Sequence, residues 1–187
     1  MWELPKSVEI NGKNYQITDD CNFKMVLDCY KALKDTELQP NEQLTCALYI
    51  FYKDFETISQ FDEKELTEAV QKMTDIMDGD RKATGKNSIK LKPVVDFEKD
   101  FPLICSSLLP ILGYDIREKD YLHWWTFLSA FRETKEGAYA MVLQIRVKQA
   151  KGIHLEKEEQ KFYRENKDII DIEMELTEEE REFLFSD

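Results

Sequence analysis

The spacing of apolar residues changes after about residue 22, and this change most constrains the fold. Before it, apolar and polar residues alternate on both sides of Asn11-Gly12, a pair that favours a tight hairpin turn. After it, apolar residues recur every three or four positions, as on one face of a helix. The pattern predicts a β-hairpin at about residues 7–18, followed by a helical chain.

Six segments carry the helical spacing. They are residues 23–36, 40–55, 62–79, 97–113, 121–131 and 138–145. The third has the clearest start, because Asp62 and Glu65 form a capping-box pattern. In the fourth, Pro102 must lie in the first turn or kink the helix, and Pro110 with Gly113 is expected to end it. We therefore expect a mainly α fold.

Length and charge suggest one domain with an acidic tail. A chain of 187 residues is the usual size of one domain, and we expect a helical domain over residues 1–165 with a mobile loop at about 79–93. The net charge is −12, and residues 165–187 hold ten acidic and two basic residues. Residues 166–187 are thus predicted to be an acidic tail. Thr177 and Glu180 make a second capping-box pattern there, so the tail is expected to contain a short helix.

Charge and hydropathy also exclude classes of partner. A net charge of −12 is repelled by phosphate backbones and anionic lipid, so neither nucleic acid nor a membrane is an expected partner. The N-terminus lacks a basic region followed by an apolar stretch. No apolar run approaches the roughly 20 residues that span a bilayer. We expect the protein to be intracellular where it is made.

No motif in the sequence indicates a metal site, a cofactor site or a catalytic site. The four cysteines form no closely spaced pair and the two histidines are far apart in the sequence, so we expect reduced thiols and no zinc site. Residues 79–87 resemble a phosphate loop but have the wrong glycine spacing, and Asn87 stands where Ser or Thr is required. We therefore expect a protein that is not an enzyme.

Two further stretches allow both a structural and a functional interpretation. The basic residues between Arg146 and Arg164 alternate with glutamates, which is typical of a solvated helix surface. Trp124 and Trp125 point about 100° apart on a helix, so one is expected in the core. The other, beside His123, would make an anchor for a protein partner if it is exposed. The alternative is that both are buried.

The second half of the chain carries a recognisable combination of segments. It consists of Phe97-Glu98-Lys99-Asp100, Ile111-Leu112-Gly113-Tyr114-Asp115-Ile116, Tyr121-Leu122-His123-Trp124-Trp125-Thr126-Phe127, Ala150-Lys151-Gly152-Ile153-His154-Leu155 and Glu159-Gln160-Lys161-Phe162-Tyr163. This combination resembles a family of tailed-bacteriophage proteins named after gene product fifteen of a Listeria-type phage. The family occurs in long-tailed phages and prophages of Gram-positive bacteria.

The resemblance implies a tail assembly chaperone. Such a protein acts in the cytoplasm of the bacterial host, binds the tape-measure protein, helps recruit the major tail protein and is absent from the mature virion. It has no catalytic residues and no cofactor. We expect partner binding by His123, Trp124, Trp125 and Phe127, and by Phe183, Leu184 and Phe185 in the tail.

Two other functions stay open at this point. The first is a structural virion component, such as a head-tail connector or tail protein. The second, suggested by the negative charge, is a DNA mimic that inhibits a host protein, although charge gathered in one tail fits it poorly. The sequence also leaves open a homo-oligomer and a longer, frameshifted form.

Overall fold

The computed structural model describes residues 3–79 and 94–172. The expected loop at about 79–93 lies, apart from Gly79, outside the described residues, and so do Phe183, Leu184 and Phe185. In chain order the elements are β1 (Ser7–Ile10), β2 (Lys13–Gln16), η1 (Thr18–Cys21), α1 (Phe23–Leu33), α2 (Pro40–Phe51), α3 (Phe55–Ile58), α4 (Glu63–Met77), α5 (Phe101–Leu112), η2 (Ile116–Glu118), α6 (Trp124–Arg132), α7 (Ala138–Ala150), α8 (Lys157–Glu165) and α9 (Lys167–Ile170). The predicted fold class is confirmed: the described chain is mainly helical, with a small N-terminal hairpin.

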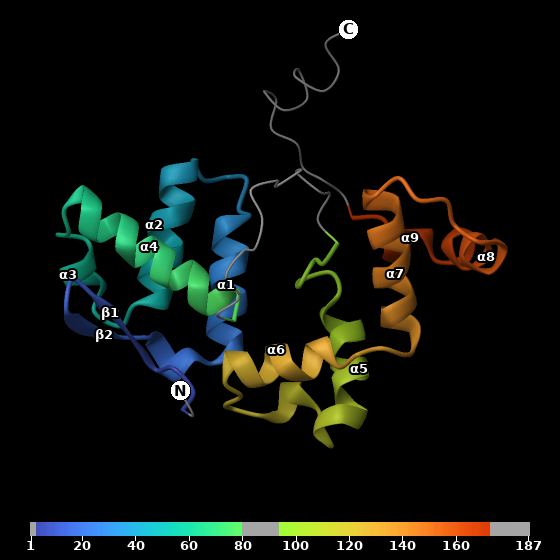
Figure 1. Ribbon diagram of the computed structural model, residues 1–187, viewed down its shortest axis with the longest axis horizontal. Helices are drawn as coiled ribbons and strands as arrows, with labels where there is room; N and C mark the ends of the chain where they lie inside the picture. Colours follow the sequence, from blue (N-terminus) through green and yellow to red (C-terminus); the bar gives the residue numbers. More distant parts are fainter. Residues whose placement is uncertain (1–2, 80–93, 173–187) are drawn as a thin grey trace, which may run out of the picture.

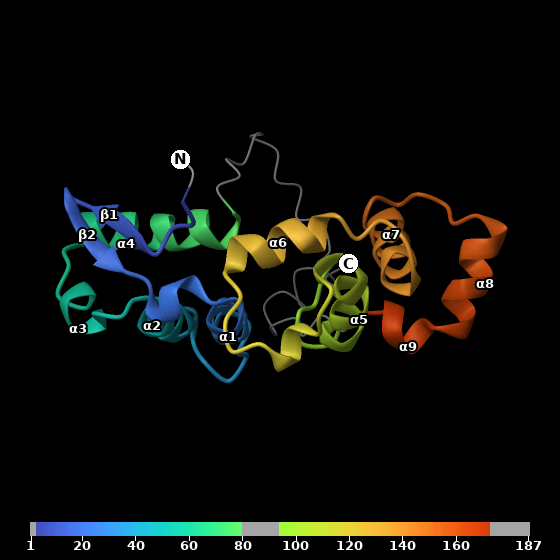
Figure 2. The same cartoon turned by 90° about the horizontal axis from the view of Figure 1, so that it is seen from below.

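The elements form two groups joined by a bridge (Figure 1). The hairpin, α1, α2, α3 and α4 lie at one end, and α7, α8 and α9 lie at the other. α5 and α6 lie between them, and the view from below has the same arrangement (Figure 2). α6 packs against α1 and α5, and α5 packs against α7, so the two middle helices join the groups.

The hairpin has the predicted turn. β1 and β2 pair antiparallel, with Ile10 opposite Lys13. Asn11 and Gly12 both have positive φ, +47° and +75°, as the tight turn requires. The side chains of Val8 and Ile10 are buried, and β1 packs against α4. The alternation in the sequence therefore identified both the strands and their inner face.

The second predicted helix is wrong at its C-terminal end. It was expected to run to residue 55, but α2 ends at Phe51 because Tyr52 is extended, with φ −97° and ψ +124°. Tyr52 forms a β-bridge with Ile17, and its hydroxyl donates to the carbonyl oxygen of Ala69 at 2.8 Å. Contacts distant in the sequence break the helix here.

The predicted start of α4 is confirmed. The Asp62 carboxylate accepts the Glu65 N–H at 2.8 Å, and the Glu65 carboxylate accepts the Asp62 N–H at 3.4 Å. Past the other end, Gly79 has φ +73°, and a Cβ there would lie 2.9 Å from Cδ1 of Leu128. Glycine thus allows both the left-handed conformation and the close approach of α6.

The predicted start of the fourth helix is wrong, whereas Gly113 ends the helix as predicted. α5 begins at Phe101, because residues 97–100 form a turn before it. Pro110 lies inside the helix, which ends at Leu112 with Gly113 in the left-handed region at φ +76°. A proline near a helix C-terminus removes one N–H donor, and the helix continues for two residues beyond it.

A buried ion pair joins α7 to the turn before α5. The Arg146 guanidinium on α7 donates to both carboxylate oxygens of Asp100, at 2.6 and 2.8 Å. It also donates to the carbonyl oxygens of Val94, Ile169 and Ile170. The expectation that Arg146 belongs to a solvated surface is therefore wrong, since its side chain is only 3% exposed.

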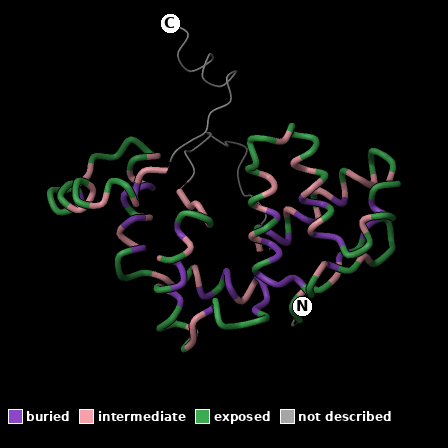
Figure 3. Tube along the Cα trace, turned by 180° about the vertical axis from the view of Figure 1, so that it is seen from behind, coloured by how far each residue is buried: buried purple, intermediate pink, exposed green. Residues whose placement is uncertain are grey.

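Burial extends past the boundary predicted at residue 165. Ile170 on α9 is fully buried, and α9 packs against α7 and α8. Figure 3 shows the buried residues along the sides of the helices that face one another in both groups. Cys21, Cys29 and Cys105 are buried free thiols, and Cys46 is half-buried.

Candidate functional site

His123, the first residue of the predicted site, caps the N-terminus of α6. Its Nδ1 accepts the Trp125 N–H at 3.0 Å, so the ring proton lies on Nε2, which donates to the carbonyl oxygen of Pro5 at 2.9 Å. The ring is buried, and this burial lowers the pKa of His123 from its ordinary value. Neutral His123 thus ties the start of α6 to the N-terminal segment.

The two tryptophans satisfy the carbonyl groups at the end of α4. The indole N–H of Trp124 donates to Met77 at 2.8 Å, and that of Trp125 donates to Ile76 at 3.0 Å. The last carbonyl groups of a helix have no partner further along it, and the Trp124 bond serves such a group at Met77. The Ile76 carbonyl oxygen also accepts the Gly79 N–H at 3.1 Å, so the Trp125 bond is a second one there. Trp124 is fully buried and Trp125 is half-buried, as the 100° rotation between adjacent helical residues predicts.

Phe127 lies in an aromatic stack in the core. Its ring is nearly parallel to those of Phe23, Trp124 and Phe131, with centroids 5.3, 5.1 and 6.1 Å away. Of the four predicted partner-binding residues on this segment, His123, Trp124 and Phe127 have buried side chains and internal contacts. Partner binding through them stays a prediction, and the contacts described here are structural.

The buried cluster positions an exposed turn next to it. Asn22 and His123 form an isolated β-bridge, and the Phe23 N–H donates to the Leu122 carbonyl oxygen at 2.9 Å. These bonds hold residues 120–123 alongside the segment that precedes α1. Three successive residues of that segment, Asp19, Asp20 and Cys21, have positive φ values of 48°, 50° and 63°. Left-handed backbone is costly for residues other than glycine, so this turn is strained.

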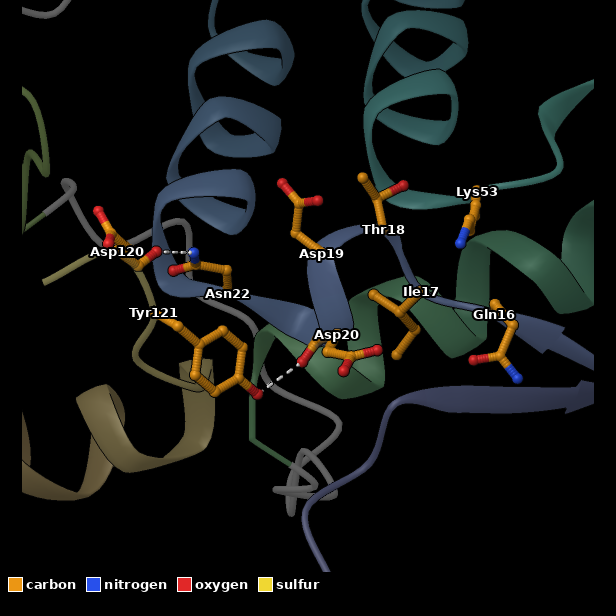
Figure 4. A pocket seen from close by; sticks show the side chains of 9 residues that line it. All are labelled: Gln16, Ile17, Thr18, Asp19, Asp20, Asn22, Lys53, Asp120 and Tyr121. Carbon is orange, nitrogen blue, oxygen red and sulfur yellow. Dashed lines mark hydrogen bonds between the residues drawn. The ribbon is translucent and has the colours of Figure 1, made fainter.

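A hollow of about 500 Å³ opens beside the turn, and we call it the acidic groove. Its lining residues are Gln16, Ile17, Thr18, Asp19, Asp20, Asn22, Lys53, Asp120 and Tyr121. Figure 4 shows Asp120 and Tyr121 reaching it from one side, Lys53 from the other, and Asp19 and Asp20 between them. The groove therefore brings together segments that are distant in the sequence, since Tyr121 lies 101 positions from Asp20.

Three hydrogen bonds define the walls of the acidic groove. The Tyr121 hydroxyl donates to the Asp20 carbonyl oxygen at 3.0 Å, and the Asn22 amide donates to the Asp120 carbonyl oxygen at 2.8 Å. The Asp20 carboxylate accepts from Lys6 at 2.8 Å. The side chains of Asp19 and Asp120 are exposed, as is almost half of Tyr121. Carboxylates beside an exposed aromatic ring suit a Lys or Arg side chain of a protein partner.

The sequence did not single out these groove residues as a site. Asp19, Asp20 and Asp120 are three of many carboxylates in an acidic chain, and Lys53 lies inside the helix predicted for residues 40–55. Tyr121 belongs to the quoted family segment, but only as part of a helical stripe. The adjacent Asp19-Asp20 pair, directly after the hairpin, was the one available signal, since aspartate tolerates left-handed backbone better than most residues.

The described residues also bear on a metal site and on a membrane-spanning helix. No group of three or more His, Cys, Asp or Glu in residues 3–79 and 94–172 is arranged to hold a metal ion. Over the same residues, no helix has the length and apolar character needed to cross a bilayer.

Comparison with known proteins places the chain in a family. The model of the bacteriophage Gp15 protein family matches residues 1–172, which include both helical groups, the acidic groove and the His123-Trp124-Trp125 segment. No curated protein and no solved structure matches the chain. The resemblance found in the second half of the sequence is thus confirmed over nearly the whole chain. The protein belongs to the bacteriophage Gp15 protein family, and is a phage structural or morphogenesis protein.

Proposed function

We propose that this protein is a tail assembly chaperone, which binds the tape-measure protein and helps recruit major tail protein subunits. It acts in the host cytoplasm by protein contacts, without catalysis or a cofactor, and leaves before the virion matures. Family membership supports the morphogenesis role. The observation that carries binding by contact is the acidic groove, whose exposed Asp19, Asp120 and Tyr121 are held in place by a buried framework.

The framework gives the groove a fixed shape. The Tyr121 hydroxyl and the Asn22 amide form hydrogen bonds between its walls, and Tyr121 lies shortly before α6, whose Trp124 and Phe127 are buried. A rigid site loses little conformational entropy when it binds, which favours affinity. We infer that cationic side chains of the client enter this groove while apolar client residues pack outside it.

Co-expression with the tape-measure protein of the same phage tests the proposal. We expect the tape-measure protein to be captured with the chain and to stay soluble, whereas alone it precipitates. The double variant Asp19→Asn, Asp120→Asn should reduce capture at least about tenfold, which corresponds to about 1.4 kcal/mol. The matched control is Glu37→Gln, Glu56→Gln, which removes the same charge from exposed residues outside the groove.

Two outcomes would contradict the proposal. If the tape-measure protein never associates and mass spectrometry finds the chain in purified virions, the chain is a structural component. If capture occurs but the groove variant and its control behave alike, the chaperone role stands and the groove is not its contact surface.

A further inference from the structure

α5 is uncharged over its whole length. Residues 101–114 contain no Asp, Glu, Lys or Arg, although 34% of the chain is charged. One side of the helix packs inward, where Ile104, Cys105 and Leu108 are fully or almost fully buried. A surface helix normally carries polar and charged residues on its other side. α5 does not, which makes that side unusual in this molecule.

The opposite side of α5 is apolar and exposed, and we call it the α5 outer face. It consists of the exposed Pro102, Ser106, Leu109 and Pro110 and the half-buried Leu103, which lie within about 120° of one another on a helix. Leu109 is 46% exposed. The Ser106 hydroxyl donates to the Pro102 carbonyl oxygen at 3.0 Å, so even this polar side chain is bonded to its own helix. A helix with apolar residues on two opposite sides ordinarily packs between two partners.

The described chain ends close to the N-terminus of α5. The Lys99 amine donates to the Asp171 carbonyl oxygen at 2.7 Å. Lys99 lies in the turn that precedes α5, and the helix begins at Phe101. Residues 173–187 therefore follow a point near the N-terminus of the helix that carries the α5 outer face.

The length of this segment is sufficient. The 11 residues from 173 to 183 span at most about 36–40 Å when extended, whereas the 12 residues of α5 are about 18 Å long. Residues 183–185 can therefore reach Leu109 and Pro110 at the far end of the face.

The apolar residues of the segment match the apolar character of the α5 outer face. Residues 173–187 hold seven carboxylates against Arg181, and the hollow where they begin is lined by three basic residues, Lys99, Arg164 and Lys167, and three acidic ones, Glu165, Asp168 and Asp171. The apolar residues of the segment include Phe183, Leu184 and Phe185. We propose that residues 173–187 bind the α5 outer face of their own chain, with residues 183–185 packed on Leu109 and Pro110. This goes beyond the proposed function and does not depend on which client the protein serves.

Site-specific photo-crosslinking in the full-length protein tests this contact. A photoreactive phenylalanine analogue replaces Leu109, whose exposed side chain tolerates the exchange, and the cross-linked peptides are identified by mass spectrometry. We expect a cross-link within one chain to residues 183–185, with a yield independent of protein concentration. The control places the analogue at Tyr49 on α2, whose side chain is 66% exposed. α2 lies in the group formed by the hairpin and α1 to α4 (Figure 1). That position should give no such cross-link.

A variant of the segment completes the test. Phe183→Asp, Leu184→Asp, Phe185→Asp should lower the cross-link yield at least about tenfold while the circular dichroism of the protein keeps its helical signal. An unchanged yield, a cross-link to other parts of the chain, or no cross-link would overturn the proposal. A cross-link between two chains, rising with concentration, would also overturn it and would assign the face to a second copy. None of these results depends on capture of the tape-measure protein.

Discussion

The indole N–H of Trp124 donates to the carbonyl oxygen of Met77 across 47 positions of sequence, at 2.8 Å. The bond joins α6 to the last turn of α4, and Trp125 makes the parallel bond to Ile76 at 3.0 Å. Both tryptophans therefore donate to carbonyl groups at the C-terminus of α4, where helical partners run out. The Ile76 carbonyl oxygen accepts the Gly79 N–H as well, at 3.1 Å. The Trp-Trp pair is thus a structural feature of the fold as well as a mark of the family.

Replacing the two tryptophans one at a time should show that the fully buried indole hydrogen bond stabilises the fold more than the half-buried one. Trp124→Phe removes a fully buried donor and leaves the Met77 carbonyl group without its main partner, so we expect a loss of about 1 to 3 kcal/mol in unfolding free energy. Trp125→Phe should cost less than about 1 kcal/mol, because water reaches a half-buried site. Urea unfolding followed by far-ultraviolet circular dichroism measures both. Equal losses would contradict the assignment of Trp124 to the core.

His123 should make stability depend on pH. Its burial lowers the folded pKa below the ordinary 6.5. The hydrogen bond to the Pro5 carbonyl oxygen raises the pKa by a smaller amount, and the effects of Lys6, which lowers it, and Asp20, which raises it, are smaller again. The unfolded chain then binds more protons than the folded chain below about pH 6.5. The stabilisation from neutral His123 is therefore complete above pH 6.5 and is lost as the pH falls from 6.5 toward the lowered folded pKa.

His123→Asn is the matched variant for this prediction. Asparagine still accepts the N–H at the start of α6 but does not titrate. Unfolding free energies measured between pH 8 and pH 5 should fall more steeply for the natural sequence than for the variant. Parallel curves would show that the pH dependence comes from other groups, such as the carboxylates.

Local sequence patterns predicted those elements whose determinants are neighbours in the chain. The hairpin depends on Asn11-Gly12, and the start of α4 depends on Asp62 and Glu65, which lie three residues apart. α2 stops short of the predicted end because Tyr52 bonds to Ile17 and Ala69, which no local pattern reveals. The acidic groove was missed for the same reason, since Asp20 and Tyr121 meet only in the folded chain.

Arg146 is the clearest case of a misleading local pattern. Its neighbours in the sequence include Lys148 and Lys151, so it was assigned to a solvated helix surface. Whether an arginine is buried depends on its partner, and Asp100 lies 46 positions away. A single sequence does not show that pairing.

Breaking the Arg146–Asp100 pair should be strongly destabilising. Arg146→Met leaves the buried Asp100 carboxylate without its partner, and we expect a loss of about 3 to 5 kcal/mol in unfolding free energy. Tyr139→Phe removes only the hydroxyl that donates to Asp100 at 3.2 Å, and should cost about 1 kcal/mol. The unfolding free energy of the double variant Asp100→Asn, Arg146→Met should fall by less than the sum of the losses in the two single variants. The reason is that the double variant keeps neither the buried carboxylate nor the buried guanidinium. Additive losses in urea unfolding would argue against a coupled pair.

Two variants of Asp19, in the left-handed turn of the acidic groove, distinguish the effect of backbone strain from that of the carboxylate on binding. Asp19 has φ +48° and an exposed side chain, so Asp19→Gly removes the carboxylate without steric cost and should change the unfolding free energy by less than about 0.5 kcal/mol. Asp19→Val removes the same carboxylate but places a β-branched residue at positive φ, and should cost about 1 to 2 kcal/mol. If the carboxylate contacts the tape-measure protein, both variants should weaken capture equally at a temperature where both are folded. If only Asp19→Val weakens capture, the shape of the turn matters and its charge does not.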